Sequence, residues 1–236
     1  EQHDILSMTL PELQAAVQEL GEPKFRAKQI FNWLHQKRVT DFSEMTTLSL
    51  PFRERLASDF CINRLKIAKR LASSVDDTVK YLYELPDGNY VETVCMQYHH
   101  GTSLCISTQV GCRMGCRFCA SAIAGFVRNL TPAEMLLQIY ETERAQNCKI
   151  SSLVLMGIGE PLDNFDNVLR FLRGKFIDNI TGFVRNKEST HFYIREADSD
   201  NVDKLATARE TQSQTVPCSL PDGQNLLLCR GLYGYC

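Results

Sequence analysis

Two strand–loop–helix units follow one another in the middle of the chain, and this succession constrains the fold more than any other feature. The first unit is an expected strand through Leu104–Ser107, followed by a helix whose start, Thr131–Glu134, has the form of a capping box. In the second unit the apolar run Ser152–Met156, typical of a buried parallel strand, precedes an expected helix over Asn167–Arg173. Since consecutive units of this kind build parallel sheets covered by helices, we predict an α/β fold, a partial TIM-like barrel.

The first 60 or so residues are predicted to be helical. Thr9–Glu12 is another capping box, and Gly21 supplies the stop of the helix that follows it. A second helix is expected from Phe25 to about Lys37, and a third should begin near Ser49–Pro51. We assign Trp33 to core packing.

Beyond the helices the apolar pattern changes to a period of two. Val79–Tyr83 and Tyr90–Val94 flank Pro86–Asn89, which is typical of a hairpin turn. After Gly174 the chain is polar and irregular, with one weak helix candidate over Val202–Arg209, so the barrel is expected to be incomplete. We therefore divide the chain into a helical N-terminal accessory domain, a β-hairpin linker, the N-terminal part of a barrel and a divergent tail, at residues 1–65, 66–102, 103–173 and 174–236.

Charge and hydropathy exclude several classes of protein. Lys and Arg number 26 against 28 Asp and Glu, so the chain as a whole is not a strongly basic nucleic-acid binder. The longest apolar stretch, Ile150–Gly159, is about half the ~20 residues that a membrane helix needs, so no membrane association is expected. The first residues are polar and acidic, unlike a secretory signal, and lack an initiator Met, which indicates a trimmed N-terminus. We expect a cytoplasmic location.

Cysteines are frequent for a protein in a reducing compartment, and three of the ten fall within eight residues. The segment GCRMGCRFCAS presents Cys112, Cys116 and Cys119 as C-x₃-C-x₂-C directly after an expected strand. Three thiolates on one loop can hold three irons of a 4Fe–4S cluster and leave the fourth iron open. The alternative is a structural zinc site with Cys105 or Cys148 as fourth ligand.

The sequence around these cysteines is similar to a known family. C-x₃-C-x₂-C is the signature of radical S-adenosylmethionine (SAM) enzymes. Three segments of the chain resemble the adenine carbon-2 methyltransferases of 23S rRNA and tRNA (RlmN type). Two are TSLCISTQVGCRMGCRFCASAIAGFVRNLTPAEMLLQ and LVLMGIGEPLDNFDNVLRFL, and the third, FRAKQIFNWLHQKRVTDFSEMTTL, resembles the accessory domain of that family. The resemblance covers about Leu6–Leu172. It implies a six-stranded partial radical SAM barrel that carries a 4Fe–4S cluster and binds SAM.

The resemblance also assigns roles to single residues. Cys112, Cys116 and Cys119 match the cluster ligands, and Gly159 and Glu160 match the pair that contacts the SAM amino group, although a G-x-G-E alone is often only a tight turn. Cys105 matches the cysteine that resolves a thioether by forming a disulfide bond; its alternative is a buried structural thiol. Glu92 matches the acceptor of the carbon-2 proton, and its alternative is an exposed carboxylate on an edge strand.

The implied reaction explains why radical chemistry is needed. Carbon 2 of adenine is electron-poor and cannot attack the methyl group of SAM as a nucleophile, so the family uses a 5′-deoxyadenosyl radical and a methyl-carrying cysteine. The implied partners are 23S rRNA, tRNA, and a one-electron reductant of the flavodoxin or ferredoxin kind. Two basic runs could contact RNA phosphates, as could single arginines near the cysteines: Glu22–Arg38, Arg64–Arg70, Arg113, Arg117 and Arg128.

The resemblance stops near Arg173. The tail has no counterpart to the family's later SAM-binding segments, and the surroundings of Cys218, Cys229 and Cys236 do not match the methyl-carrying cysteine. The leading hypothesis is an RNA adenine-C2 methyltransferase. The alternatives are a catalytically inactive, truncated metal-binding RNA module and a relative that methylates carbon 8.

Overall fold

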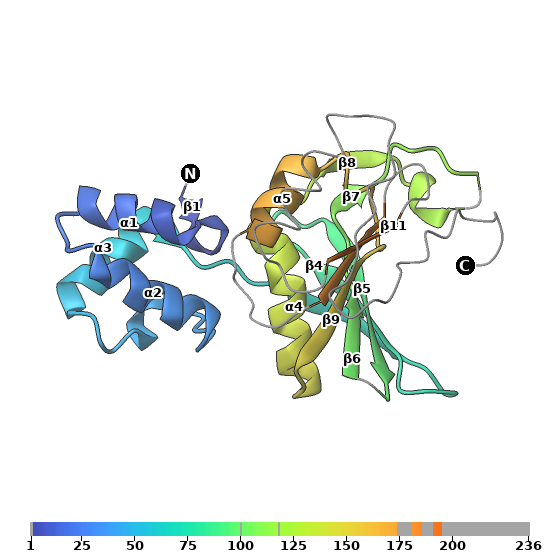
Figure 1. Cartoon of the computed structure of the whole chain (residues 1–236), viewed down its shortest axis with the longest axis horizontal. Helices are drawn as coiled ribbons and strands as arrows, with labels where there is room; N and C mark the ends of the chain where they lie inside the picture. The colour runs from blue at the N-terminus through green and yellow to red at the C-terminus, as the bar shows by residue number, and fades with distance from the viewer. Residues whose placement is uncertain (1, 100, 118, 174–180, 186–190, 195–236) are drawn as a thin grey trace, which may run out of the picture.

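The chain folds into a group of helices joined to a mixed β-sheet with two helices packed against it (Figure 1). The computed structural model describes residues 2–99, 101–117, 119–173, 181–185 and 191–194. The predicted α/β class is confirmed. The helix expected over Val202–Arg209 lies outside the described residues.

The accessory helices form where their capping signals predict them. They are α1 (Leu10–Glu19), α2 (Phe25–His35) and α3 (Leu50–Asp59), with short 3₁₀ turns η1 (Ile5–Ser7) and η2 (Phe42–Glu44) and the parallel strand pair β1 (His3–Asp4) and β2 (Phe60–Cys61). The Thr9 backbone N–H donates to Glu12 Oε2 at 2.8 Å, which satisfies one end of the predicted capping box. Gly21 takes a φ of +79°, the left-handed conformation that ends a helix cheaply only at glycine.

Apolar side chains from the three accessory helices meet in a common core. Leu13, Ile30, Leu34 and Leu56 are completely or almost completely buried there. Trp33 is half-buried against this core, and its indole Nε1 donates to Thr47 Oγ1 at 2.8 Å. The predicted packing role of Trp33 is therefore confirmed, with its polar edge turned outward.

Seven strands form one sheet in the order β11-β10-β9-β6-β5-β4-β3. Their bounds are β3 (Lys66–Ala72), β4 (Val79–Glu84), β5 (Tyr90–Tyr98), β6 (Gly101–Cys105), β9 (Ile150–Leu155), β10 (Thr181–Arg185) and β11 (His191–Ile194). Strands β3 to β6 are antiparallel neighbours, β6, β9 and β10 are parallel, and β11 returns antiparallel to β10. The sheet is mixed, and among the described residues it does not close into a barrel.

Two expectations about the strands change. The predicted hairpin is part of a meander that includes β3, and it continues the same sheet as β6 rather than standing apart as a linker. The tail, expected to be irregular, contributes β10 and β11, so the apolar strand β9 is an interior strand and not an exposed edge. Strand β3 was not predicted, because its residues do not alternate between apolar and polar and all of them are exposed.

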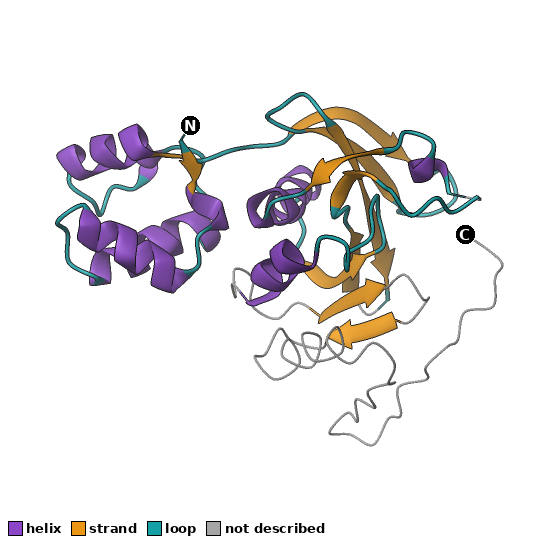
Figure 2. Cartoon of the chain, turned by 90° about the horizontal axis from the view of Figure 1, so that it is seen from above, coloured by secondary structure: helices purple, strands orange, loops and turns teal. Residues whose placement is uncertain are grey.

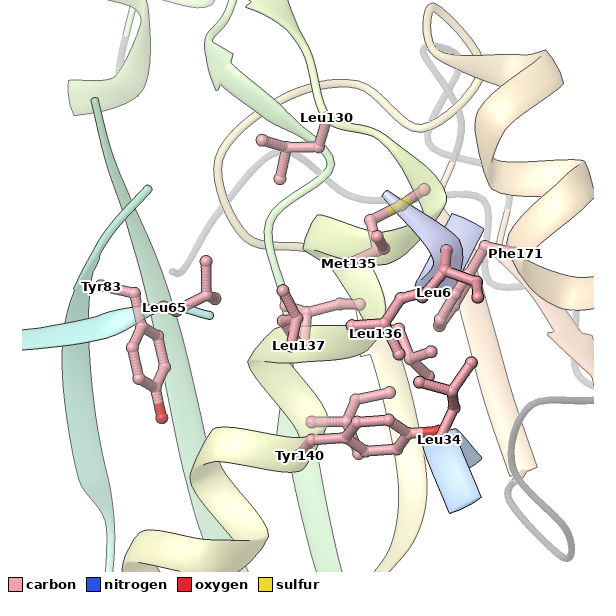
Figure 3. Close-up of a cluster of buried hydrophobic side chains, with 14 of the residues drawn as sticks. Leu6, Leu34, Leu65, Tyr83, Leu130, Met135, Leu136, Leu137, Tyr140 and Phe171 are labelled. Carbon is pink, nitrogen blue, oxygen red and sulfur yellow. The ribbon is translucent and has the colours of Figure 1, made fainter. Parts of the chain in front are cut away.

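Helices α4 (Pro132–Gln146) and α5 (Phe165–Arg173) cover one face of the sheet and lie between it and the accessory helices (Figure 2). Residues 132–143 of α4 are all buried, polar ones included. The reason is visible in Figure 3, where Leu6 and Leu34 of the accessory domain lie on one side of α4 and Tyr83 of β4 on the other. A helix that is covered on two sides has no solvated face.

Polar contacts also join the accessory domain to α4. His35 is buried, and its Nδ1 lies 3.0 Å from the hydroxyl of Tyr140. Burial, with a smaller effect of the nearby Arg38 charge, lowers the pKa of His35 to about 3. Arg38 forms an ion pair with the buried Glu143, and Arg64 pairs with Glu141 at 3.1 Å.

Candidate functional site

The predicted site residues gather where β6 and β9 end. Both strands run in the same direction, so the segments that follow them leave the sheet at the same edge. After β6 the chain enters β7 (Gln109–Gly111), passes through the cysteine segment and the 3₁₀ turn η3 (Ala120–Ala122), and returns as β8 (Phe126–Asn129). After β9 it enters the Gly-Ile-Gly-Glu-Pro loop.

The three-cysteine segment is a closed loop on the β7–β8 hairpin. The backbone N–H of Cys112 donates to the carbonyl of Gly125 at 3.0 Å, which joins the two ends of the loop. Gly111 has a φ of +71°, and a side chain there would collide with the Gly125 carbonyl. Glycine is therefore required at position 111, where the two ends of the loop cross. The sequence GCRMGC includes this glycine, but the crossing that requires it is seen only in the structure.

The thiols of this loop are accessible to different degrees. Cys116 is exposed, while Cys112 and Cys119 are half-buried. Burial raises the pKa of the Cys112 thiol, and the nearby Cys119, Cys116 and Glu160 add to that rise. Three thiols within electrostatic range on one loop are a soft donor set that fits iron–sulfur ligation.

A single-ion site is a poorer fit. Among the described residues, no three or more His, Cys, Asp or Glu side chains converge tightly enough to hold one metal ion. Cys148 interacts instead with Cys95 and with Thr102, at the opposite end of β6 from the cysteine loop. The zinc alternative with Cys148 as fourth ligand is therefore wrong.

The Gly-rich loop after β9 lies directly against the segment after β6. The N–H of Gly157 donates to the Ile106 carbonyl at 3.0 Å, and the Ile158 carbonyl accepts from the Thr108 N–H at 2.9 Å. A Cβ at Gly157 would lie 2.7 Å from the Ile106 carbonyl carbon, and Gly159 has a φ of +106°. The loop is thus a close backbone crossing, and glycine is needed at both positions.

Glu160 is brought to the cysteine loop. Its backbone N–H donates to Gln109 Oε1 at 2.9 Å, and its carboxylate accepts from the Leu162 N–H at 3.2 Å. The same carboxylate is near enough to Cys112 to raise the pKa of that thiol. The structure therefore places Gly159 and Glu160 beside the first cysteine of the loop.

A polar framework that the sequence did not predict joins the two loops. Gln109 Nε2 donates to Asn129 Oδ1 at 2.8 Å and to Asp163 Oδ2 at 3.0 Å. Asn164 Nδ2 donates to the carbonyls of Thr108 and Leu130 at 2.7 and 2.8 Å. These amides satisfy buried backbone groups from distant segments, so no local pattern could have marked them.

Cys105 and Glu92 lie on one face of the sheet. Cys105 is opposite Val94 of β5, and Glu92 is two residues from Val94, so alternation turns both side chains away from α4. Cys105 is half-buried, whereas its neighbours Leu104 and Ile106 are completely buried. The alternative of a buried structural thiol is therefore not favoured.

Glu92 is held by partners on both sides. Lys80 Nζ of β4 lies 2.7 Å from Glu92 Oε1, and both side chains are about 40% exposed. The hydroxyl of Ser107 donates to the Glu92 carbonyl at 2.6 Å and accepts from the Ile158 N–H at 3.0 Å. Because β5 is an interior strand, the alternative of a carboxylate on an edge strand is wrong.

Several candidate RNA-binding cations are engaged within the protein. Arg128 forms ion pairs with Asp87 and Glu134, both at 2.7 Å, and Arg113 pairs with Asp163 at 2.7 Å. Lys37 lies over the Trp33 ring, 3.4 Å from its centroid. The exposed cations of the two basic runs include Lys24 and Lys28 in the first run and Lys66, Lys69 and Arg70 of β3 in the second.

A cavity of about 530 Å³ lies between the accessory domain and the β8–α4 region. Its wall includes Asp4, Glu12, Asp87, Arg128 and Arg170. None of the three loop cysteines lines it, so it is separate from the candidate site.

Comparisons with known proteins agree with this geometry. Residues 3–62 match the ribosomal RNA large subunit methyltransferase N-terminal domain. The probable dual-specificity RNA methyltransferase RlmN of Lachnoclostridium phytofermentans is 53% identical over 176 residues, which are 73% of this chain and 49% of the relative. The protein of the same name from Clostridium novyi is 48% identical over 170 residues, 72% of this chain and 50% of the relative.

Over 72–73% of its length the chain is thus similar to RlmN proteins. A solved radical SAM methyltransferase from Sphaerobacter thermophilus is similar to it in fold, with a TM-score of 0.69 and 32% identity, over 76% of this chain and 56% of the other. The chain spans about half the length of the RlmN proteins it matches. Among the described residues, no helix is both long and apolar enough to cross a membrane.

Proposed function

We propose that this chain is the N-terminal and cluster-binding part of a radical SAM methyltransferase that adds a methyl group to carbon 2 of an adenine in 23S rRNA and tRNA. The observation that supports it most is the joining of the cysteine loop to the Gly159–Glu160 loop at the ends of β6 and β9. Similarity to RlmN proteins, which are named RNA methyltransferases, supports RNA as the substrate class. The predicted six-stranded barrel and cytoplasmic location stay predictions.

The cysteine loop and the Gly-rich loop would have separate roles in binding. Cys112, Cys116 and Cys119 would hold a 4Fe–4S cluster, and the backbone at Gly159 and Glu160 would bind the SAM amino group. Cluster and SAM together supply a one-electron reductive cleavage that generates a carbon radical. A reductant of the flavodoxin or ferredoxin kind would deliver the electron.

Glu92 and Cys105 would act on the RNA base from the shared open face of the sheet. The carboxylate of Glu92 would accept the carbon-2 proton, and Lys80 at 2.7 Å would hold it in place. The thiolate of Cys105 would attack the sulfur of the thioether that links the methyl-carrying cysteine to the base. The new disulfide would replace the sulfur–carbon bond, whose electron pair stays on the carbon and takes up a proton to complete the methyl group on the released base. No cysteine of this chain is assigned as the methyl carrier.

An anaerobic experiment tests the proposal. The chain is reconstituted with iron and sulfide, then given SAM and dithionite, and 5′-deoxyadenosine is measured. We expect the wild type to form it and Cys112→Ala to fail. A loaded cluster with no cleavage of SAM would overturn the enzymatic proposal and favour the inactive RNA-binding module. A single bound zinc without iron–sulfide absorption would overturn the cluster assignment.

RNA products test the finer assignments. The RNA product is digested to nucleosides. Separating these nucleosides shows whether the methyl group is on carbon 2 or carbon 8 of the adenine. In Cys105→Ala we expect a covalent protein–RNA adduct to accumulate wherever a methyl carrier is present. Recovery of only unmodified RNA in that variant, beside methylated RNA from the wild type, would contradict the role of Cys105.

A further inference from the structure

The side chain of Gln109 makes hydrogen bonds both to the cysteine hairpin and to the Gly-rich loop. It is completely buried and lies three residues before Cys112. Its Oε1 accepts from the Glu160 N–H at 2.9 Å, and its Nε2 donates to Asn129 and Asp163. Both N–H groups and the oxygen of the amide are therefore used.

The partners also fix which way the amide points. Nε2 faces two oxygen acceptors and Oε1 faces a backbone donor, so a flipped amide would lose every one of these bonds. Gly159 closes over the same side chain, since a Cβ at Gly159 would lie 2.6 Å from Gln109 Cβ. The Gly159–Glu160 backbone is thus seated on Gln109.

A second link leads back to the cysteines. Asp163 accepts from Gln109 Nε2 and also pairs with Arg113 Nε at 2.7 Å. Arg113 follows Cys112 directly and stacks on Phe126 of β8, 4.0 Å from the ring centroid. The cysteine loop is therefore attached to the Gly-rich loop at two places. Gln109 attaches it before the first cysteine, and Arg113 attaches it directly after that cysteine.

We propose that Gln109 is a positioning residue that sets the place of Gly159 and Glu160 relative to the three cysteines. The proposal rests on the proposed function, in which SAM contacts both loops at once. Gln109 itself does not touch SAM. It acts by holding the Glu160 N–H and the Asp163 carboxylate, so its loss would weaken SAM binding and leave the cysteines able to load iron.

The test compares Gln109→Met with Gln138→Met. Gln138 is equally buried and makes comparable bonds, to the N–H and carbonyl of Ser107 and to Thr93, but it does not contact residues 159–163. Each chain is measured for iron content after anaerobic reconstitution and for SAM affinity by equilibrium dialysis. Amide hydrogen exchange over residues 157–164 is measured on the cluster-free chains.

We expect Gln109→Met to load iron like the wild type, to bind SAM about tenfold more weakly, and to exchange the Glu160 amide faster. Gln138→Met should bind SAM within about twofold of wild type, because the hydrogen bonds of Gln138 go to Ser107 and Thr93 and not to residues 159–163. Equal SAM affinities in the two variants, or unchanged exchange in Gln109→Met, would overturn the proposal.

Two further variants keep the test decisive if Gln109→Met does not fold. Asp163 is 29% exposed, so Asp163→Ala and Asp163→Asn are tolerated more easily. The alanine removes the acceptor that Gln109 Nε2 and Arg113 share, whereas asparagine keeps an acceptor oxygen and should retain more of the SAM affinity. Equal affinities of both variants and the wild type would refute the proposal. If the wild type loads iron but binds no SAM, the proposed function fails, while hydrogen exchange still reports on Gln109.

Discussion

Gly159→Ala is expected to destabilise the fold far more than an alanine at an ordinary turn glycine. Gly159 has a φ of +106°, and an alanine held in such a conformation costs about 1–3 kcal/mol. Its Cβ would also lie 2.6 Å from Gln109 Cβ and 2.8 Å from the Gln109 backbone nitrogen. That nitrogen cannot retreat without breaking its bond to the Ile158 carbonyl, so overpacking adds about 1–3 kcal/mol. We expect a total loss of about 2–6 kcal/mol.

Gly88 in the β4–β5 turn is the matched control. Its φ of +81° is also positive, but nothing lies within 4 Å of the added Cβ. Gly88→Ala should therefore cost only the conformational part, about 1 kcal/mol. Urea denaturation of the three chains, followed by circular dichroism, gives the two differences in the free energy of unfolding. If Gly159→Ala were no more destabilising than Gly88→Ala, the close crossing of the two loops would be refuted.

Three further predictions concern titration and burial. Because the folded pKa of His35 is about 3 against an ordinary 6.5, the unfolded chain binds the proton first, so stability present at pH 7 is lost as the pH falls from 6.5 toward 3. Between pH 6.5 and 5 this loss is about 2 kcal/mol, and His35→Gln should lack it; equal losses in both chains, measured by urea denaturation, would contradict the assignment. Burial raises the pKa of Cys95 to about 12 while Cys116 is exposed, so iodoacetamide at pH 8 should label Cys116 long before Cys95 by mass spectrometry, and simultaneous labelling would argue against the fold around β5. Arg38→Met leaves Glu143 buried without its cation and should cost about 3 kcal/mol, whereas a change below about 1 kcal/mol in thermal unfolding would show that the ion pair is solvated.

Local chemistry made the helices and the cysteine loop predictable. A capping box at Thr9, a stop at Gly21 and a second capping box at Thr131 act within one helical turn, so the sequence shows them directly. The Thr131 hydroxyl accepts from the Glu134 N–H at 3.2 Å, as the motif requires. The cysteines share one loop because their spacing is short, and spacing needs no tertiary information.

What escaped prediction depends on contacts between distant segments. Gln109, Asp163 and Asn164 have ordinary surroundings in the sequence and matter only because β6 and β9 end side by side. The continuous burial of α4 likewise follows from its two coverings and not from its own pattern. The roles of Glu92 and Cys105 stay predictions, although the register does put them on a common face.

The double covering of α4 determines what happens when the accessory domain is removed. Its outer side meets the accessory domain through the His35–Tyr140 contact and through a hydrogen bond from the Ala133 N–H to Ser7 Oγ at 3.2 Å. Its inner side holds the end of β6, where Gln138 bonds both backbone groups of Ser107. Cutting away the first 62 residues would expose the apolar side chains of α4 that pack against the accessory domain (Figure 3). The N-terminal helices are therefore part of the folded core. A chain shortened by them should precipitate rather than merely lose affinity for RNA.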